Sequence, residues 1–492
     1  MKDLKEKAIR GGLARFMAQG ADFSLRLLSL TVLARLLNPK DFGLVGMVTA
    51  FTGVLMLFRD FGLSAAVIQH GSVTEDQLSN LFWINVLVGA VLALLLAAGA
   101  PVMAAFYHEP RLRAVTAVLA LSFLFNAVGI QHGAMLQREM RFTAVAVINT
   151  LSLVTGVALA IGGSLAGYGY WALVAMTVTG PLVASSGFWI ATGWVPGRPR
   201  RRTGIRSLMR FGGTVTLNGL VVYVGSNFEK VLLGRYWGAD AIGLYGRAFQ
   251  LVNIPTANLN TAAGEVAFAG LSRVQDDGER LRRYFLRGYS LILAMTVPLT
   301  LLCSLFSPDV IRVFLGPKWG EAAPIFRYLA PTILVFAIAN PLSWLLMSLG
   351  MISRLLKMGL VIAPIMIASY LVGLPYGPTG VALAYSTVMA LWLFPLIAWA
   401  LHGTPVSFRD ILATAYKPLA CGIVAAGLAF AVRTVYGHSL PPFPRLALES
   451  LVLLGAFSVL LLFVAGQKSL YLDLFRGLMK RPPVEDKGLV AA

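Results

Sequence analysis

The chain has 492 residues, of which 57% are hydrophobic and 13% are charged. Soluble globular proteins have about 45–50% apolar and about 25% charged residues, so this composition excludes a set of soluble domains and indicates a polytopic membrane protein. A formal net charge of +19 would by itself be compatible with binding of nucleic acid. However, the basic residues cluster in short loops between apolar segments, and no basic patch interleaved with aromatic residues is present to stack bases. No nucleic-acid partner is expected.

An all-α membrane fold is predicted, because the chain holds about 14 apolar segments long enough to cross a bilayer as helices. A basic, proline-rich linker at 194–206 follows the sixth segment, and a basic tail follows the last. The expected spans are 12–37, 42–69, 81–106, 114–136, 142–165, 171–193, 208–237, 242–271, 289–314, 325–349, 355–374, 380–401, 411–436 and 446–465.

The first span carries charge in an otherwise apolar stretch. Asp22 and Arg26 lie four residues apart, and Gln19 and Ser29 continue the same helical face. Insertion of a charged residue at the centre of a bilayer costs about 2.5–3.5 kcal/mol. Two interpretations stay open: a polar face that lines a wet cavity, or an intrahelical ion pair that helps the bundle pack.

The loop charges predict the orientation. With the N-terminus in the cytoplasm, cytoplasmic segments hold about four times as many Lys and Arg residues as the loops on the other side. This asymmetry predicts an even number of spans, with both termini in the cytoplasm.

Three pairs of segments, each about 200 residues apart, indicate an internal repeat related by an axis along the membrane normal. Residues 38–46 match 238–246, the turn at 106–110 matches 314–317, and the turn at 167–169 matches 377–380. We therefore expect an N-lobe at 1–204 (spans one to six), a C-lobe at 205–405 (spans seven to twelve), spans 13 and 14 at 406–467, and a basic cytoplasmic tail at 468–492.

Polar residues concentrate in spans one, two, seven and eight, where a parallel repeat would place a substrate path between the lobes. Pro255 lacks a backbone donor in mid-span and is predicted to kink span eight, so that it can act as a hinge. A buried, self-satisfied polar seam is the competing interpretation of span eight. Glu229 and Lys230 are either a cavity pair or an interfacial pair.

The sequence lacks the short motifs of several chemistries. It contains no phosphate loop with Gly-Lys-Ser/Thr and no Gly-x-Ser-x-Gly nucleophile motif. The five histidines are scattered, with no pair at metal-binding helical spacing. We therefore expect neither an enzyme nor a resident cofactor or metal. Cys303 and Cys421 are interpreted as small core hydrophobes.

Four motifs resemble the polysaccharide-repeat-unit (Wzx-type) flippases of the multidrug/oligosaccharidyl-lipid/polysaccharide exporter superfamily. They lie at 33–44, 59–66, 227–234 and 243–248. The resemblance implies two six-helix lobes plus two C-terminal helices, in the bacterial inner membrane. It implies that undecaprenyl-pyrophosphate-linked oligosaccharide moves from the cytoplasmic to the periplasmic leaflet for export of exopolysaccharide, capsule or O-antigen. Polysaccharide polymerase and export machinery are the implied partners.

The implied cargo gives the polar residues provisional roles. Guanidinium groups bind phosphate by forked, charge-assisted bonds, amides suit sugars, and acids can balance the cations or carry a coupling ion, Na+ or H+. Rocking of the two lobes around the site would give alternating access. The candidates are Arg26, Arg59, Arg247 and Lys230 for pyrophosphate, Asn218, Gln250, Asn253 and Asn258 for sugar, and Asp22, Asp60, Glu229 and Glu265 as acids.

Two related functions remain alternatives: the lipid II flippase branch, which also has a cationic cavity, and a cation-coupled multidrug antiporter. Antiporter sites favour acids and aromatic residues, so the arginines count against that class. A polysaccharide-linked membrane enzyme is a more distant alternative. The energy source is open between an ion gradient, the membrane potential and mass action.

Overall fold

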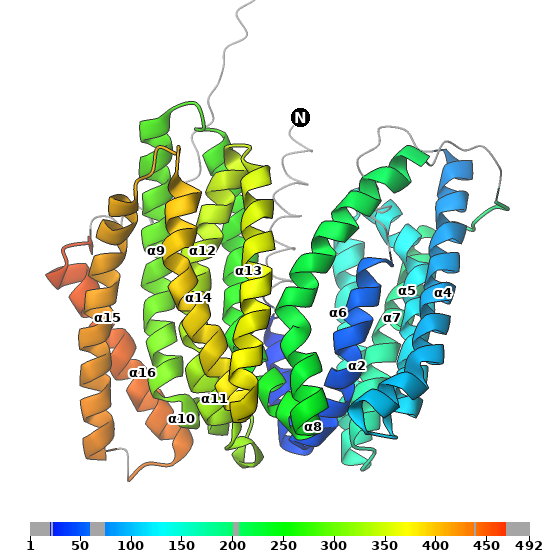
Figure 1. The fold of residues 1–492 in the computed structure, drawn as a ribbon, viewed down its shortest axis with the longest axis horizontal. Helices are drawn as coiled ribbons and strands as arrows, with labels where there is room; N and C mark the ends of the chain where they lie inside the picture. The colour runs from blue at the N-terminus through cyan, green and yellow to red at the C-terminus, as the bar shows by residue number, and fades with distance from the viewer. Residues whose placement is uncertain (1–19, 21–22, 60–73, 200–205, 437–438, 469–492) are drawn as a thin grey trace, which may run out of the picture. The chain divides into compact units, whose positions relative to one another are not determined.

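The computed structural model describes residues 20, 23–59, 74–199, 206–436 and 439–468, without the side chains of 206–222, 258–263, 265 and 266. These residues form helices, and no strand occurs among them (Figure 1). Ten helical stretches of the described part are long and apolar enough to cross a membrane. The all-α polytopic membrane fold is therefore confirmed. The total of 14 spans stays a prediction, because the expected spans 12–37, 42–69, 208–237 and 242–271 are only partly described.

The helices of the first half follow the expected spans. Residues 23–36 are helical. The described part of this half also contains α2 (Pro39–Leu57), α4 (Glu75–Tyr107), α5 (Leu112–Arg138), α6 (Phe142–Leu165) and α7 (Tyr170–Thr192). The second half comprises α8 (Arg206–Ser272), α9 (Gly278–Leu305), α10 (Ser307–Phe314), η1 (Pro317–Trp319), α11 (Ala322–Leu329), α12 (Pro331–Ser348), α13 (Ile352–Gly373), η2 (Leu374–Tyr376), α14 (Gly377–Leu401), α15 (Phe408–Tyr436), α16 (Pro442–Val459) and a π-helical end, η3 (Leu460–Val464).

Local sequence signals explain several helix ends. The backbone N–H of Asn38 donates to the Asp41 carboxylate over 3.0 Å, and Pro39 takes the first helical position of α2, where it loses no intrahelical bond. Asp277 caps α9 by accepting from the N–H of Arg280 over 3.0 Å. Because of this cap, α9 begins eleven residues before the expected start at 289. The basic residues before 289 therefore lie inside the helix and not in a loop before it: Arg280, Arg282, Arg283 and Arg287.

The chain divides into two compact units. One comprises Met1–Asn258, Val310–Leu329 and Ser353–Trp392, and the other comprises Leu259–Asp309, Ala330–Ile352 and Leu393–Ala492. The expected lobe boundaries at 204 and 405 stay a prediction. In the first unit, α5 packs against α4 and α7. A Cβ atom at Gly129 would lie 2.2 Å from the Ser185 hydroxyl oxygen, so the absence of a side chain lets α5 and α7 approach closely.

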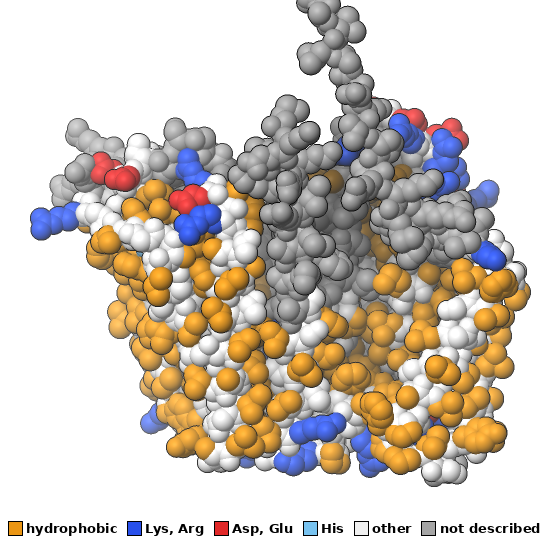
Figure 2. Space-filling view, turned by 180° about the vertical axis from the view of Figure 1, so that it is seen from behind, with side chains coloured by type: hydrophobic (Ala, Val, Ile, Leu, Met, Phe, Trp, Pro, Cys, Tyr) orange, Lys and Arg blue, Asp and Glu red, His pale blue; other side chains and the backbone are white. Residues whose placement is uncertain are grey.

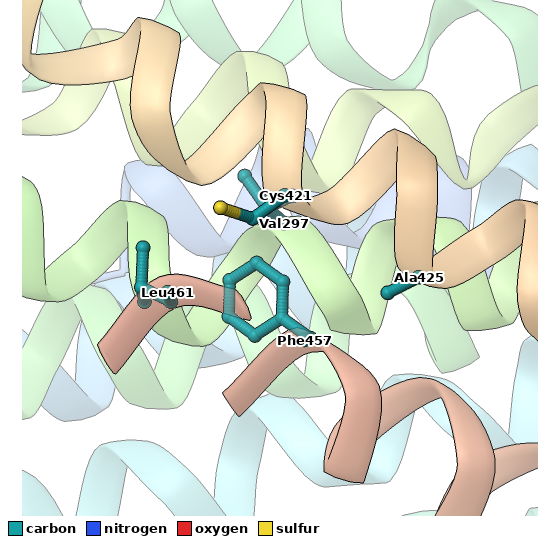
Figure 3. Close-up of a cluster of buried hydrophobic side chains, with 5 residues drawn as sticks. All are labelled: Val297, Cys421, Ala425, Phe457 and Leu461. Carbon is teal, nitrogen blue, oxygen red and sulfur yellow. The ribbon is translucent and has the colours of Figure 1, made fainter. Parts of the chain in front are cut away.

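The second unit has an apolar core among α9, α15 and α16 (Figure 3). Its buried members are Val297, Cys421, Ala425, Phe457 and Leu461. Cys303 and Cys421 are both free and buried, as expected for small core residues.

A buried cluster of charges also lies in the second unit. Asp309 and Glu449 are each 1% exposed. Arg433 lies 3.3 Å from the Asp309 carboxylate and 3.6 Å from that of Glu449, and the Nε of Arg445 donates to Asp309 over 2.9 Å. Near the start of α15, Arg282 of α9 donates through Nε to Asp410 over 2.8 Å. These ion pairs connect α15 to α9, α15 and α16 to α10, and α15 to α16.

The described surface has the distribution of side chains that a membrane protein requires. Figure 2 shows hydrophobic side chains spread over the flank, with Lys and Arg side chains gathered toward the two ends. Exposed Leu, Val and Phe residues on α4, α13 and α15 belong to this apolar surface, and Leu94, Val372 and Val435 are 67–70% exposed. Lipid would cover such a surface, so these exposed side chains are consistent with the membrane fold.

Candidate functional site

The start of α2 crosses the second half of α8. α8 bends at Gly238, whose φ of 80° and ψ of −171° are non-helical, and a new helical run begins at Ala239. A Cβ atom at Gly43 would lie 1.7 Å from the carbonyl oxygen of Ala239, and one at Gly243 would lie 1.9 Å from the carbonyl oxygen of Pro39. Each glycine of the predicted repeat thus packs against the backbone of the other copy. We call this contact of Pro39 and Gly43 with Ala239 and Gly243 the helix crossing.

A second pair of contacts repeats the same symmetry. Arg35 and Arg235 occupy equivalent positions before the two copies of the crossing segment. The Nη2 of Arg35 donates to the carbonyl oxygen of Val313 over 2.8 Å. Arg235 hydrogen-bonds the Nδ1 of His108 over 2.6 Å. Each arginine therefore holds the turn that follows the third span of the opposite half, as the matching of 106–110 with 314–317 leads us to expect.

Arg247 lies two turns beyond Ala239 and faces α2. Its guanidinium carbon lies 4.3 Å from the centre of the Phe42 ring, which is a cation–π contact. The same guanidinium donates to the side-chain oxygen of Gln250. Two of the predicted site residues are therefore brought together, beside a ring that the sequence did not single out. The ring of Trp319 also contacts Phe42, edge to face, with 5.5 Å between the ring centres.

Glu229 is the one predicted acid whose side chain the structure describes, and it is buried. It is 1% exposed, and neither carboxylate oxygen has a hydrogen-bond partner. Four phenol groups, from α8, α13 and α14, lie near enough to interact with its charge: Tyr223, Tyr245, Tyr370 and Tyr385. An isolated buried carboxylate is costly in its charged form, so this position is suited to take up a proton or a small cation.

Lys230 does not form a salt bridge with Glu229. Its Nζ donates instead to the side-chain oxygen of Asn227 over 2.6 Å. The amide of Asn227 in turn donates to the backbone of its own helix, to the oxygen of Tyr223 over 3.0 Å. Lys230 is half-buried while Glu229 is buried. The roles of the two residues, as a cavity pair or as an interfacial pair, stay predictions.

Arg59 lies just after α2 and contacts α5. Its Nη1 donates to the side-chain oxygen of Asn126 over 3.0 Å, and the Asn126 amide donates to the backbone oxygen of Ser122 over 2.8 Å. Asn126 was not among the predicted residues. An amide in a largely apolar span was the signal that could have identified it.

The structure gives fewer contacts for the remaining predicted residues. Arg26 and Asn253 are exposed, and Ser29 donates to the backbone oxygen of Arg26 over 2.9 Å. α8 continues as helix through Pro255, so the hinge at this residue stays a prediction. Asp22 and Asp60 lie outside the described residues, and so do the side chains of Asn218, Asn258 and Glu265.

The structure offers no cluster for a metal ion within the part that it describes. No group of three or more His, Cys, Asp or Glu side chains there could hold one.

Comparison with known proteins identifies the family of this chain. The family described as "Polysaccharide biosynthesis protein" matches residues 32–324, which include both copies of the helix crossing. The chain belongs to this family. This match, together with the relatives below, confirms the family resemblance expected from the sequence. The lipopolysaccharide biosynthesis protein WzxC of Escherichia coli is 26% identical over 351 residues, 70% of each chain. The teichuronic acid biosynthesis protein TuaB of Bacillus subtilis is 30% identical over 315 residues, 61% of this chain and 62% of TuaB.

A solved structure shares the fold over almost the whole chain. The lipid II flippase MurJ in an inward closed conformation superimposes with a TM-score of 0.73, covering 96% of this chain and 100% of MurJ at 14% identity. At that identity, the likeness concerns the fold alone. It confirms the membrane-transporter architecture expected from the sequence.

Proposed function

We propose that this chain is a flippase for lipid-linked oligosaccharides. It would move undecaprenyl-pyrophosphate-linked polysaccharide repeat units from the cytoplasmic to the periplasmic leaflet. The observation that carries the proposal is the symmetric helix crossing within residues matched by the polysaccharide biosynthesis family. The relatives named for lipopolysaccharide and teichuronic acid synthesis support a polymer precursor as cargo. The helix crossing together with these relatives fits a transporter and not an enzyme.

The crossing suggests how one side of the membrane is closed. By the charge asymmetry of the loops, this end of α2 and α8 faces the periplasm. Backbone packed against backbone leaves no room for a sugar to pass there. Transport then requires the two copies of the crossing segment to separate, which is alternating access between the repeats. The protein would lie in the bacterial inner membrane with both termini in the cytoplasm.

Arg59 and Arg247 are the proposed phosphate-binding residues for which the structure gives contacts. Each is already held by an amide side chain, Asn126 or Gln250. Such support orients the guanidinium before the cargo arrives, and forked bonds from guanidinium to phosphate are strong because they are charge-assisted. Asn253 and the side chains of Asn218 and Asn258 remain proposed sugar contacts, and Arg26 and Lys230 remain proposed cations.

Glu229 is the proposed site for a coupling ion. Its carboxylate lacks a hydrogen-bond partner, and the surrounding phenol oxygens could share a proton or contact Na+. We propose no other resident cofactor. Asp22, Asp60 and Glu265 stay candidate counter-charges.

A deletion strain tests the proposal. Lipid-linked repeat units should accumulate while surface polysaccharide is lost, and the wild-type gene should restore both. Accumulated lipid-linked peptidoglycan precursor with normal repeat-unit pools would instead support the lipid II alternative. Unchanged pools of both lipids, with altered sensitivity to cationic drugs, would support a multidrug antiporter.

A further inference from the structure

Three completely buried polar side chains lie in the helices α4 and α5 of the first unit. Asn85, Gln131 and His132 are each 0% exposed. Five of their polar atoms have no hydrogen-bond partner: Nδ2 and Oδ1 of Asn85, Nε2 and Oε1 of Gln131, and Nε2 of His132. An unpaired buried polar group costs about 1–3 kcal/mol, so five of them in one helix pair require an explanation.

The register of the two helices brings these side chains to one place. A Cβ atom at Gly89 would lie 2.4 Å from the Cβ of Ala127, which fixes the point where α4 and α5 meet. The two helices are antiparallel neighbours joined by a short turn. Asn85 is one turn before Gly89 and Gln131 is one turn after Ala127, so both lie on the contact faces at the same level. The rings of Phe82 and His132, 6.0 Å apart, mark the next contact along the pair.

Thr192 connects His132 to α7. The Thr192 hydroxyl oxygen lies 2.7 Å from Nδ1 of His132 and 3.0 Å from the backbone oxygen of Phe188. The hydroxyl has one hydrogen, so Nδ1 is its acceptor or its donor according to the tautomer of the ring. In either tautomer Nε2 is left without a partner: it needs a donor when Nδ1 carries the proton, and an acceptor when Nε2 carries it.

The missing partner has to be small, neutral and able both to donate and to accept. The two amide oxygens need donors, the two amide nitrogens need acceptors, and Nε2 of His132 needs one or the other according to its tautomer. With His132 as the neutral imidazole, the three side chains carry no charge, so the site itself offers nothing to balance an anion or a cation. Water meets all of these requirements, and buried water typically makes about three hydrogen bonds to such groups.

We propose that Asn85, Gln131 and His132 form a binding site for ordered water, sealed between α4, α5 and α7. The site lies under the segment where the linker after α7 begins. The ring of Trp194 is 5.2 Å from that of His132, and Trp83 donates to the backbone oxygen of Gly197 over 2.8 Å. The water would connect the α4–α5 contact to His132 and, through it, to the start of this linker.

Hydroxyl-radical footprinting of the full-length protein in lipid tests this site, because radicals form from water bound next to a side chain even when bulk solvent is excluded. His132 should be oxidised several-fold faster than Trp319. Trp319 is also 0% exposed, but its Nε1 already donates to Ala34 over 2.8 Å. The double variant N85L/Q131M removes four of the five unpaired atoms at similar volume, and should bring His132 oxidation down to the Trp319 level.

A high-resolution structure of the wild-type protein is the second measurement, so the proposal stays testable if the double variant does not fold. Density for water within hydrogen-bond distance of Nε2 of His132 is expected. Oxidation of His132 at the level of Trp319, or a direct Asn85–Gln131 hydrogen bond with no water density beside His132, would overturn the proposal.

Discussion

Gly43 and Gly243 have the same role in the two halves of the chain. Each lies against the backbone of the other copy, Gly43 against Ala239 and Gly243 against Pro39, so closely that neither could carry a Cβ atom without a shift. Such reciprocal contacts are the mark of a two-fold relationship between parallel repeats. The sequence repeat is therefore also a packing relationship, and it joins the two copies at one end of the membrane.

The variants G43A and G243A should each impair transport, because the new Cβ atom would meet a backbone oxygen at under 2 Å. Overpacking of this kind costs about 1–3 kcal/mol, and it acts on the closed crossing. Surface polysaccharide per molecule of protein should fall for both variants. The control is G246A on the same helix, where nothing lies within 4 Å of an added Cβ. Equal activity of G43A, G243A and G246A would contradict the role of the crossing.

Arg35 and Arg235 should each be needed to hold the turn that they contact. R35A frees the turn around Val313, and R235A frees the turn around His108. In either variant, a single cysteine at the freed turn should react faster with a membrane-impermeant thiol reagent. R113A is the matched control, because Arg113 is exposed on the same side. If R113A raises the rate as much as R35A, general charge loss explains the effect and not anchoring.

Substitutions at Arg247 should separate charge from stacking. R247A should reduce flipping by about 10- to 100-fold, the equivalent of a charge-assisted hydrogen bond of about 1.5–3 kcal/mol. R247K keeps the charge but loses the planar contact with Phe42, and an intermediate rate is expected. F42L removes the ring alone and should match R247K. R59A should lose activity as R247A does. Normal flipping by R59A and R247A at normal protein levels would rule out their binding of phosphate.

The variant E229Q should lose ion-coupled transport while folding normally. Glutamine keeps the shape of the buried side chain and is neutral, so the helix packing should survive and the protonation or cation binding should not. The measurement is the dependence of the flipping rate on a proton or sodium gradient. E279Q is the control, because Glu279 is exposed at the start of α9. An unchanged gradient dependence in E229Q would exclude Glu229 as the coupling site.

The buried charges of the second unit should be important for stability. R433L leaves the carboxylates of Asp309 and Glu449 with less compensation, and breaking a buried pair costs about 3–5 kcal/mol. The thermal unfolding temperature in detergent should drop clearly. R409L changes an exposed arginine near the start of α15 and should have little effect. A similar unfolding temperature for R433L and the wild type would show that lipid-facing packing alone holds α15 and α16.

The sequence predicts some of these features and not others, for physical reasons. Hydrophobic length locates the spans, and the repeat is visible because glycines at matching positions meet the same steric demand. The surroundings of Glu229 could be predicted only in part, since two of its four phenol neighbours, Tyr370 and Tyr385, come from α13 and α14, far along the chain. Phe42 was missed because a phenylalanine in a membrane helix has many equally good packing partners. Asn85, Gln131 and His132 were missed because their spacing on separate helices carries no periodic signal.

The most direct test of the flippase proposal uses the purified protein in vesicles loaded with a fluorescent undecaprenyl-pyrophosphate-linked oligosaccharide. A glycosidase added outside digests only sugar in the outer leaflet. With this protein present, the protected inner-leaflet pool should disappear, whereas vesicles with G43A should retain most of it. A protected pool equal to that of protein-free vesicles, with correctly folded protein and the ion gradient in place, would contradict the account.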